Sequence, residues 1–213
     1  MNSVSYHLHF EQMGLHQIGV KMKILAYFRA MKALVVLFLI KYLGRLDNLK
    51  FTYRNHFGKN VSLNFDKNAN VFLGKDIGLR DNVCLSCRNG GRLFLGDNVF
   101  LNNGCQIIVH DEIFIEKNVK VGQYTCFFDH DYDFRAPNGL LGKKFKTTPI
   151  IVGEGTWIGS GCIILRGSKI GKNCVIGAGC IIKGVIEDGS VVVEKRVRNK
   201  YLVKKQGEKY NEY

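Results

Sequence analysis

The feature that most constrains the fold is a repeat of six residues between positions 152 and 187. Each hexad opens with Val or Ile, its second residue is Gly in four of six hexads, and its fifth is small in five. The opening residues are Val152, Ile158, Ile164, Ile170, Ile176 and Ile182. Helices and flat strands have periods of about 3.6 and 2 residues, so the chain must turn a corner after each short strand.

Three such strands close a triangular coil of about 18 residues, and successive coils stack at the spacing of paired strands, roughly 4.8 Å. The opening aliphatic residue then fills the interior, while the small fifth residue fits where two walls converge. Gly and Asn at the corners supply the positive φ that such turns need. The repeat therefore predicts an all-β solenoid.

This pattern resembles that of the hexapeptide-repeat acyltransferases, and the resemblance extends over residues 57–193. It implies a left-handed parallel β-helix, which is an exception to the right-handed crossover rule. Hexads earlier in the chain run from Leu73 to Phe127, with extra residues at 86–91 and 110–112. We expect those extra residues to bulge from a single edge of the prism.

The chain divides into an N-terminal helical segment at 1–50, a β-helix at 51–193 and a charged tail at 194–213. Within the β-helix, residues 131–149 match no hexad and contain both prolines. We expect a protruding loop there, and long loops in compact domains are usually functional.

Residues 1–50 carry seven Lys or Arg against one Asp and one Glu. The absence of Pro and the single Gly between 20 and 45 predict one or two helices. The apolar run at 33–40 is far shorter than the roughly 20 residues that span a bilayer. Two interpretations stay open: a helix packed on the solenoid or a neighbouring subunit, and a basic amphipathic helix in which residues 20–45 lie on an anionic membrane.

The formal net charge of +13 indicates an anionic partner, and no nucleic-acid module is evident in the sequence. We therefore expect a phosphorylated cofactor or a membrane surface rather than nucleic acid. Four of the seven Cys occupy the small position of a hexad, and only Cys84 and Cys87 have metal-like spacing. We expect no metal site, and free buried thiols indicate a reducing compartment, the cytoplasm.

The candidate catalytic residue is His130, where the hexads give way to the loop. Moving an acyl group from a thioester to a hydroxyl needs a base, and His is the usual one. The segment resembles the sugar O-acetyltransferase branch of the family, in which a His just before the loop deprotonates the acceptor. The alternative is a surface His flanked by carboxylates.

Asp129 and Asp131 flank this His. Because neighbours on an extended chain point to opposite sides, we expect neither to hold the imidazole ring. They would instead raise the local acidity or bind substrate hydroxyls. His110, at a coil corner, is a weaker catalytic candidate.

The resemblance also implies a site for acetyl-CoA. Trp157 matches an aromatic residue that lines the cleft in the family, and Ser160 and Ala178 match small residues whose backbone contacts the pantetheine arm. Alternatively, Trp157 lies at a subunit interface and the small residues only suit corners. The chain departs from the family further on, and the candidates for the 3′-phosphate are Lys183 and Arg198.

Acceptor-binding candidates are Asn103, which we expect about one coil before His130 and close to it, and Asp111. An Asn near this position contacts the acceptor in the sugar acetyltransferases and could help to stabilise an oxyanion. The alternative for Asn103 is a corner residue.

The resemblance implies an acetyl-CoA-dependent O-acetyltransferase that acts on a sugar hydroxyl in bacterial surface polysaccharide synthesis. Direct transfer is expected, because no Ser or Cys has the setting of a nucleophile. We also expect a cytoplasmic homotrimer, since family members build each active site between two subunits. The alternatives are an N-acetyltransferase of a nucleotide-linked amino sugar and a non-catalytic β-helix scaffold.

Overall fold

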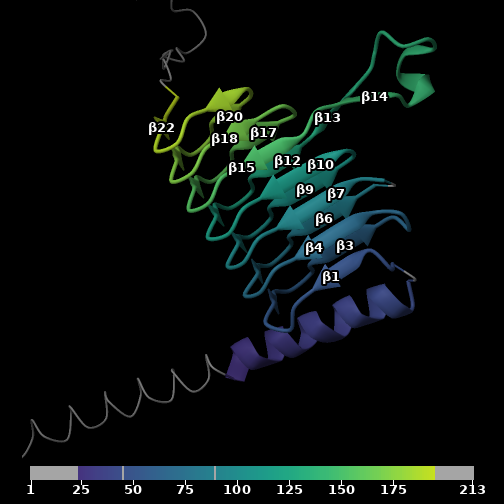
Figure 1. The fold of residues 1–213 in the computed structure, drawn as a ribbon, viewed down its shortest axis with the longest axis vertical. Helices are drawn as coiled ribbons and strands as arrows, with labels where there is room; N and C mark the ends of the chain where they lie inside the picture. Colours follow the sequence, from purple (N-terminus) through teal and green to yellow (C-terminus); the bar gives the residue numbers. More distant parts are fainter. Residues whose placement is uncertain (1–23, 45, 89, 195–213) are drawn as a thin grey trace, which may run out of the picture.

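The protein is described by a computed structural model that covers residues 24–44, 46–88 and 90–194. Three parallel sheets form the walls of a triangular solenoid, a helix lies across its N-terminal end, and a hairpin projects from one side (Figure 1). The predicted parallel β-helix with an N-terminal helix and a protruding loop is confirmed. Its first strand begins at Leu49, two residues before the expected boundary.

Each coil contributes one strand to each wall, so strands three apart in the sequence are neighbours, or five apart where the hairpin strands β13 and β14 intervene. The first sheet contains β1 (Leu49–Phe51), β4 (Asn70–Leu73), β7 (Arg92–Leu95), β10 (Glu112–Ile115), β15 (Ile150–Val152), β18 (Lys169–Ile170) and β21 (Val185–Ile186). The second contains β2 (His56–Phe57), β5 (Gly78–Leu79), β8 (Phe100–Leu101), β11 (Lys120–Val121), β16 (Trp157–Ile158), β19 (Val175–Ile176) and β22 (Val191–Val192). The third contains β3 (Ser62–Phe65), β6 (Cys84–Cys87), β9 (Gln106–Val109), β12 (Cys126–Phe128), β17 (Ile163–Leu165) and β20 (Ile181–Ile182).

The core consists of equivalent hexad positions stacked in register. Val121 pairs with Ile158, which pairs with Ile176, and all three are buried. The small fifth residues are buried as expected, among them Cys162 and Cys174. At the corners Asn60, Asn82, Asn98, Asn118 and Asn173 adopt φ between 51° and 63°. The sequence pattern thus specifies both the interior and the turns.

The extra residues of the early coils do lie at one edge of the prism, between the third sheet and the first. They do not all bulge, however. Ser86 and Cys87 extend strand β6, and Cys87 pairs with Val109. The insertion is therefore partly used to lengthen strands, because added residues that pair with the next coil satisfy their backbone groups.

The N-terminal helix covers residues 24–42 in the described part of the chain. It packs Ala33 and Leu37 against the first coil, where both are fully buried. The Lys32 Nζ donates to the Gly58 carbonyl at 2.7 Å and the Lys41 Nζ to the Leu49 carbonyl at 3.0 Å. Within residues 24–44, 46–88 and 90–194, no helix is long and apolar enough to span a bilayer.

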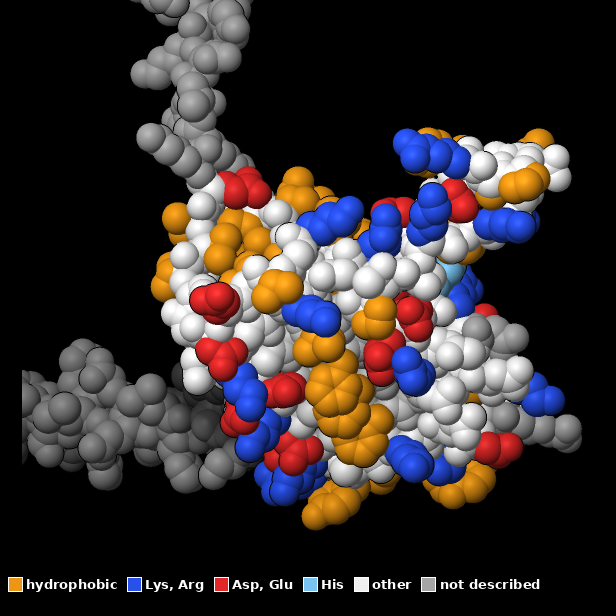
Figure 2. Space-filling model, turned by 45° about the horizontal axis from the view of Figure 1, so that its top comes forward, with side chains coloured by type: hydrophobic (Ala, Val, Ile, Leu, Met, Phe, Trp, Pro, Cys, Tyr) orange, Lys and Arg blue, Asp and Glu red, His pale blue; other side chains and the backbone are white. Residues whose placement is uncertain are grey.

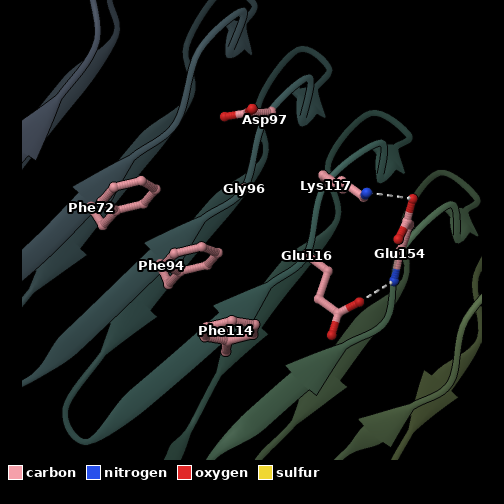
Figure 3. Close-up of a pocket in the computed structure, with 8 residues that line it drawn as sticks. All are labelled: Phe72, Phe94, Gly96, Asp97, Phe114, Glu116, Lys117 and Glu154. Carbon is pink, nitrogen blue, oxygen red and sulfur yellow. Dashed lines mark hydrogen bonds and ion pairs between the residues drawn. The ribbon is translucent and has the colours of Figure 1, made fainter.

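Three aromatic rings form a ladder on the first sheet (Figure 3). Phe72, Phe94 and Phe114 stand on neighbouring strands, with ring centroids 4.7 Å and 4.2 Å apart and nearly parallel planes. A hollow beside the ladder is lined by charged residues, two of which pair with each other: the Lys117 Nζ lies 3.3 Å from the Glu154 carboxylate. We interpret the ladder as a staple that joins three successive coils.

We expect Phe94→Ala to destabilise the protein by about 2 kcal/mol, because it removes both ring stacks and leaves a gap on a half-buried surface. In a thermal scan the midpoint should fall by roughly 4–8 °C. Phe134→Ala is the control, because Phe134 is exposed in the hairpin. Equal midpoints for the two variants would contradict the role of the ladder.

Candidate active site

The projecting loop is a hairpin that starts directly after the third-sheet strand β12. Its strands β13 (His130–Tyr132) and β14 (Phe145–Thr147) pair antiparallel, and a short 3-10 helix, η1 (Gly139–Gly142), lies between them. Figure 2 shows the hairpin standing away from the solenoid, with a His side chain at the surface near its base. An ion pair between Arg166 and Asp131 ties this base to the next coil.

Asp129 occupies a position that is apolar in the two preceding coils. The register of β9 with β12 continues the inward positions, so Asp129 falls where Val109 and Cys87 lie one and two coils earlier. The side chain is fully buried. A buried carboxylate is costly unless it is hydrogen-bonded, so its partners define what it does.

Three N–H groups meet the Asp129 carboxylate. The backbone nitrogen of His110 lies 2.9 Å from Oδ1, and that of Asp111 lies 2.7 Å from Oδ2. The third partner is the imidazole of His130, whose Nδ1 lies 3.1 Å from Oδ1. Since a carboxylate only accepts hydrogen bonds, Nδ1 carries the proton. In the neutral ring Nε2 then has a free lone pair, with which His130 can act as a base.

The expectation that neither neighbouring Asp holds the ring is therefore wrong for Asp129. It assumed an extended chain, but the chain bends at Asp129 as it leaves the solenoid for the hairpin. Because of this bend, the imidazole of His130, which points outward, can reach the inward-pointing carboxylate of Asp129. Asp131 behaves as expected, because its carboxylate pairs with Arg166 instead.

His110 stacks on His130, a contact that the sequence analysis missed. The two ring centroids are 3.7 Å apart and the planes are inclined by 21°. Phe145, from the returning strand of the hairpin, packs edge-on against both rings, at 4.3 Å from His110 and 5.4 Å from His130. The hairpin thus encloses the pair, and the side chain of His130 is only 15% exposed.

The candidate residues separate onto two edges of the prism. The edge between the third sheet and the first, here called the histidine edge, carries His110, Asp111, His130 and Lys183. The edge between the second sheet and the third, here called the glycine corner, carries Asn103, Ser160 and Ala178. Trp157 lies on the adjoining strand β16, where it is 58% exposed, as its outward hexad position predicted.

The expected closeness of Asn103 to His130 is wrong within one chain. The two residues are separated by the length of a third-sheet strand, and a four-residue strand such as β9 spans about 13 Å. Asn103 accepts a hydrogen bond from the Asp81 backbone at 3.2 Å, so it holds a corner together. Counting coils in the sequence located Asn103 correctly along the solenoid axis. It did not distinguish the glycine corner, where Asn103 lies, from the histidine edge.

The glycine corner is closely packed along the axis. A Cβ on Gly159 would lie 2.6 Å from the Ala178 nitrogen, and one on Gly122 would lie 2.5 Å from the Ser160 nitrogen. By contrast, a Cβ on Gly161 would meet no heavy atom within 4 Å. The backbone is therefore accessible from outside at this corner, which fits a thin ligand such as a pantetheine arm. Arg198 lies outside the described residues.

Four of the seven thiols are poorly suited to act as nucleophiles. Burial raises the pKa of Cys87 to about 12 and that of Cys105 to about 11, and it also raises the pKa of Cys126 and of Cys162. A thiol needs a lowered pKa to be reactive near neutral pH. Among the residues that the structure describes, no group of three or more His, Cys, Asp or Glu could hold a metal ion.

Comparisons with known proteins agree with this architecture. Residues 149–184 match the family model described as bacterial transferase hexapeptide (six repeats). A solved N-acyltransferase from Bacillus cereus, a mutant in complex with dTDP and coenzyme A, has a similar fold, with a TM-score of 0.57 at 18% identity over 70% of this chain and 80% of that one. The resemblance to hexapeptide-repeat acyltransferases is thereby confirmed.

Two sequence relatives are named as acetyltransferases. A protein of Mycobacterium tuberculosis, named a probable acetyltransferase, is 31% identical over 63% of this chain and 46% of its own length. A protein of Escherichia coli, whose name assigns it O-acetyl transfer in lipopolysaccharide biosynthesis, is 23% identical over 66% of this chain and 72% of its own. The chain spans about half the length of the first relatives that it matches.

The pH dependence of stability should report the environment of His110. Burial, with the neighbouring charge of His130, lowers the pKa of His110 below its ordinary value of 6.5. Below pH 6.5 the unfolded chain then takes up a proton more readily than the folded protein, so the free energy of unfolding falls as the pH falls.

We therefore expect the wild type to lose more thermal stability between pH 7.5 and pH 5.5 than His110→Gln, which cannot titrate. NMR titration of the His110 ring should give a midpoint below 6.5. A midpoint above 6.5, or identical pH dependence in the variant, would contradict the enclosed stack.

Proposed function

We propose that this protein is an acetyl-CoA-dependent O-acetyltransferase that uses His130 as its general base. The observation that carries the proposal is the hydrogen bond from His130 Nδ1 to the buried Asp129, which leaves Nε2 facing away from the carboxylate. Among the described residues Asp129 is the one buried carboxylate, and a non-catalytic scaffold has no need for it. The names of the acetyltransferase relatives support the same class of reaction.

In this mechanism Nε2 of His130 takes the proton of an acceptor hydroxyl as the oxygen attacks the thioester carbonyl. The C–S bond then breaks, and the imidazolium returns its proton to the departing thiolate. Asp129 holds the ring in the correct tautomer and stabilises the positive charge that forms on it. Transfer is direct in this mechanism, and the pKa that burial raises at Cys87, Cys105, Cys126 and Cys162 disfavours an acyl-enzyme on those thiols.

The acceptor we propose is a sugar hydroxyl, in bacterial surface polysaccharide synthesis. The name of the Escherichia coli relative supports this class. Asp111 is the acceptor-binding candidate on the histidine edge. The free cysteines favour a cytoplasmic location, where acetyl-CoA is made.

We further propose that the site is completed by a second copy of the chain in a homotrimer. His130 and the candidate donor-binding residues Trp157, Ser160 and Ala178 lie on different edges of the prism. The histidine edge of one subunit would face the glycine corner of the next, which also brings Asn103 into reach of His130. Lys183, on the histidine edge, would then approach the donor from the opposite side.

His130→Ala should lower kcat by roughly 10²–10⁴-fold, the usual contribution of a general base. Release of free thiol from acetyl-CoA would be followed with a panel of mono- and oligosaccharides. Binding of acetyl-CoA, measured by calorimetry, should change little, because the donor is held elsewhere. His56→Gln serves as the control, since His56 contacts the N-terminal helix. A folded His130→Ala protein that keeps more than about a tenth of the wild-type kcat would exclude this residue as the base.

Asp129→Asn should lower kcat by roughly 10–10³-fold and leave the KM for acetyl-CoA unchanged, because it acts through His130. The amide places a donor among N–H groups, so we also expect a stability loss of about 1–3 kcal/mol. Asp131→Asn is the matched control on the other side of His130. The role of Asp129 would be refuted if both variants had the same kcat.

A further inference from the structure

The N-terminal helix presents an apolar face to solvent. Its outward residues recur at intervals of four and three: Ile24, Phe28, Met31, Val35, Phe38 and Tyr42. Each of these six side chains is large and at least 42% exposed. The opposite face of the helix is already used, since Ala33 and Leu37 pack on the solenoid. A contiguous apolar surface of this kind on a folded protein marks an interaction site.

The cations of the helix are turned away from this face. The ammonium groups of Lys32 and Lys41 donate to carbonyls of the solenoid, Gly58 and Leu49. The basic residues therefore flank the apolar face instead of interrupting it. In the sequence, residues 12–46 contain six Lys or Arg and no Asp or Glu. The apolar face thus lies within a stretch of sequence whose charged residues are all cationic.

We infer that this face docks the protein on an anionic lipid bilayer, with the helix lying in the interface. Apolar and aromatic side chains would enter the headgroup region, and the surrounding cations would attract anionic lipid. Two tyrosines, Tyr27 and Tyr42, are exposed on the helix, and amphipathic rings of this type suit the membrane–water boundary. Over residues 24–42, the part of the chain that the structure describes here, the helix does not qualify as a membrane span, and we place it in the plane of the bilayer.

A second copy of the chain fits this face less well. The six residues do follow a heptad spacing, but Leu25, Tyr27 and Leu39 are also exposed and widen the stripe beyond a coiled-coil seam. Aromatic residues occupy half of the seam, where Leu, Ile and Val are preferred. Two copies would also bring cationic segments together without an acidic residue between 12 and 46 to pair with them.

The test is co-sedimentation of the full chain with two kinds of unilamellar vesicle. One contains phosphatidylcholine alone, and the other contains phosphatidylcholine with roughly a third of the anionic lipid phosphatidylglycerol. We expect binding to the mixed vesicles and at least about tenfold weaker binding to the neutral ones. A triple variant, Phe28→Gln, Val35→Gln and Phe38→Gln, should lower the partition coefficient by roughly 30-fold or more, because it removes the apolar centre.

The matched control changes three exposed valines at the other end of the solenoid, Val185→Gln, Val191→Gln and Val193→Gln, and should bind as the wild type does. Circular dichroism must show the same helix content in all three proteins. The inference is overturned if the wild type stays in the supernatant, or if the helix variant binds as well as the control. It is also overturned if sedimentation without lipid shows an assembly that only the helix variant loses, because a second copy would then cover the face.

Discussion

The register between successive coils determines where every candidate group of this protein lies. Because β9 pairs with β12 one coil later, position 110 stacks on position 130 and position 109 on position 129. The same register aligns the small residues of the glycine corner. A shift by one residue would exchange inward and outward positions and turn Asp129 out to solvent. The site is therefore a consequence of solenoid stacking rather than of the hairpin alone.

Asp129 illustrates how a regular repeat can carry chemistry. It takes an inward position that Val109 and Cys87 fill in earlier coils, and the chain leaves the solenoid immediately afterwards. The bend frees two backbone N–H groups of the preceding coil to bind the carboxylate. This interaction fixes His130 without any further residue of the hairpin, while Phe145 supplies the apolar cover. Positioning and enclosure thus come from different parts of the chain.

The sequence was sufficient for the fold and for His130 as the candidate, because the hexad period reports inward positions directly and its interruption marks the hairpin. It was insufficient for the partners of His130. Inward alternation from Phe127 places residue 129 inside, and a carboxylate in that phase is the signal that could have identified Asp129. The stacking of His110 on His130 depends on the lengths of the coils, which differ from the 18 residues of three hexads. The edge on which Asn103 lies depends on the same lengths. Those lengths became certain only with the strand register.

The central claim is that the histidine edge of one chain works with the glycine corner of another. Its most direct test is the activity of mixed oligomers formed by co-expression of His130→Ala with Ala178→Trp, a variant that fills the corner. Each variant alone should be nearly inactive. If sites are shared between chains, about a quarter of the sites in a random mixture combine an intact His130 with an intact corner, and thiol release from acetyl-CoA should recover to a similar fraction of the wild-type rate. A mixture no more active than either variant alone would contradict the shared site.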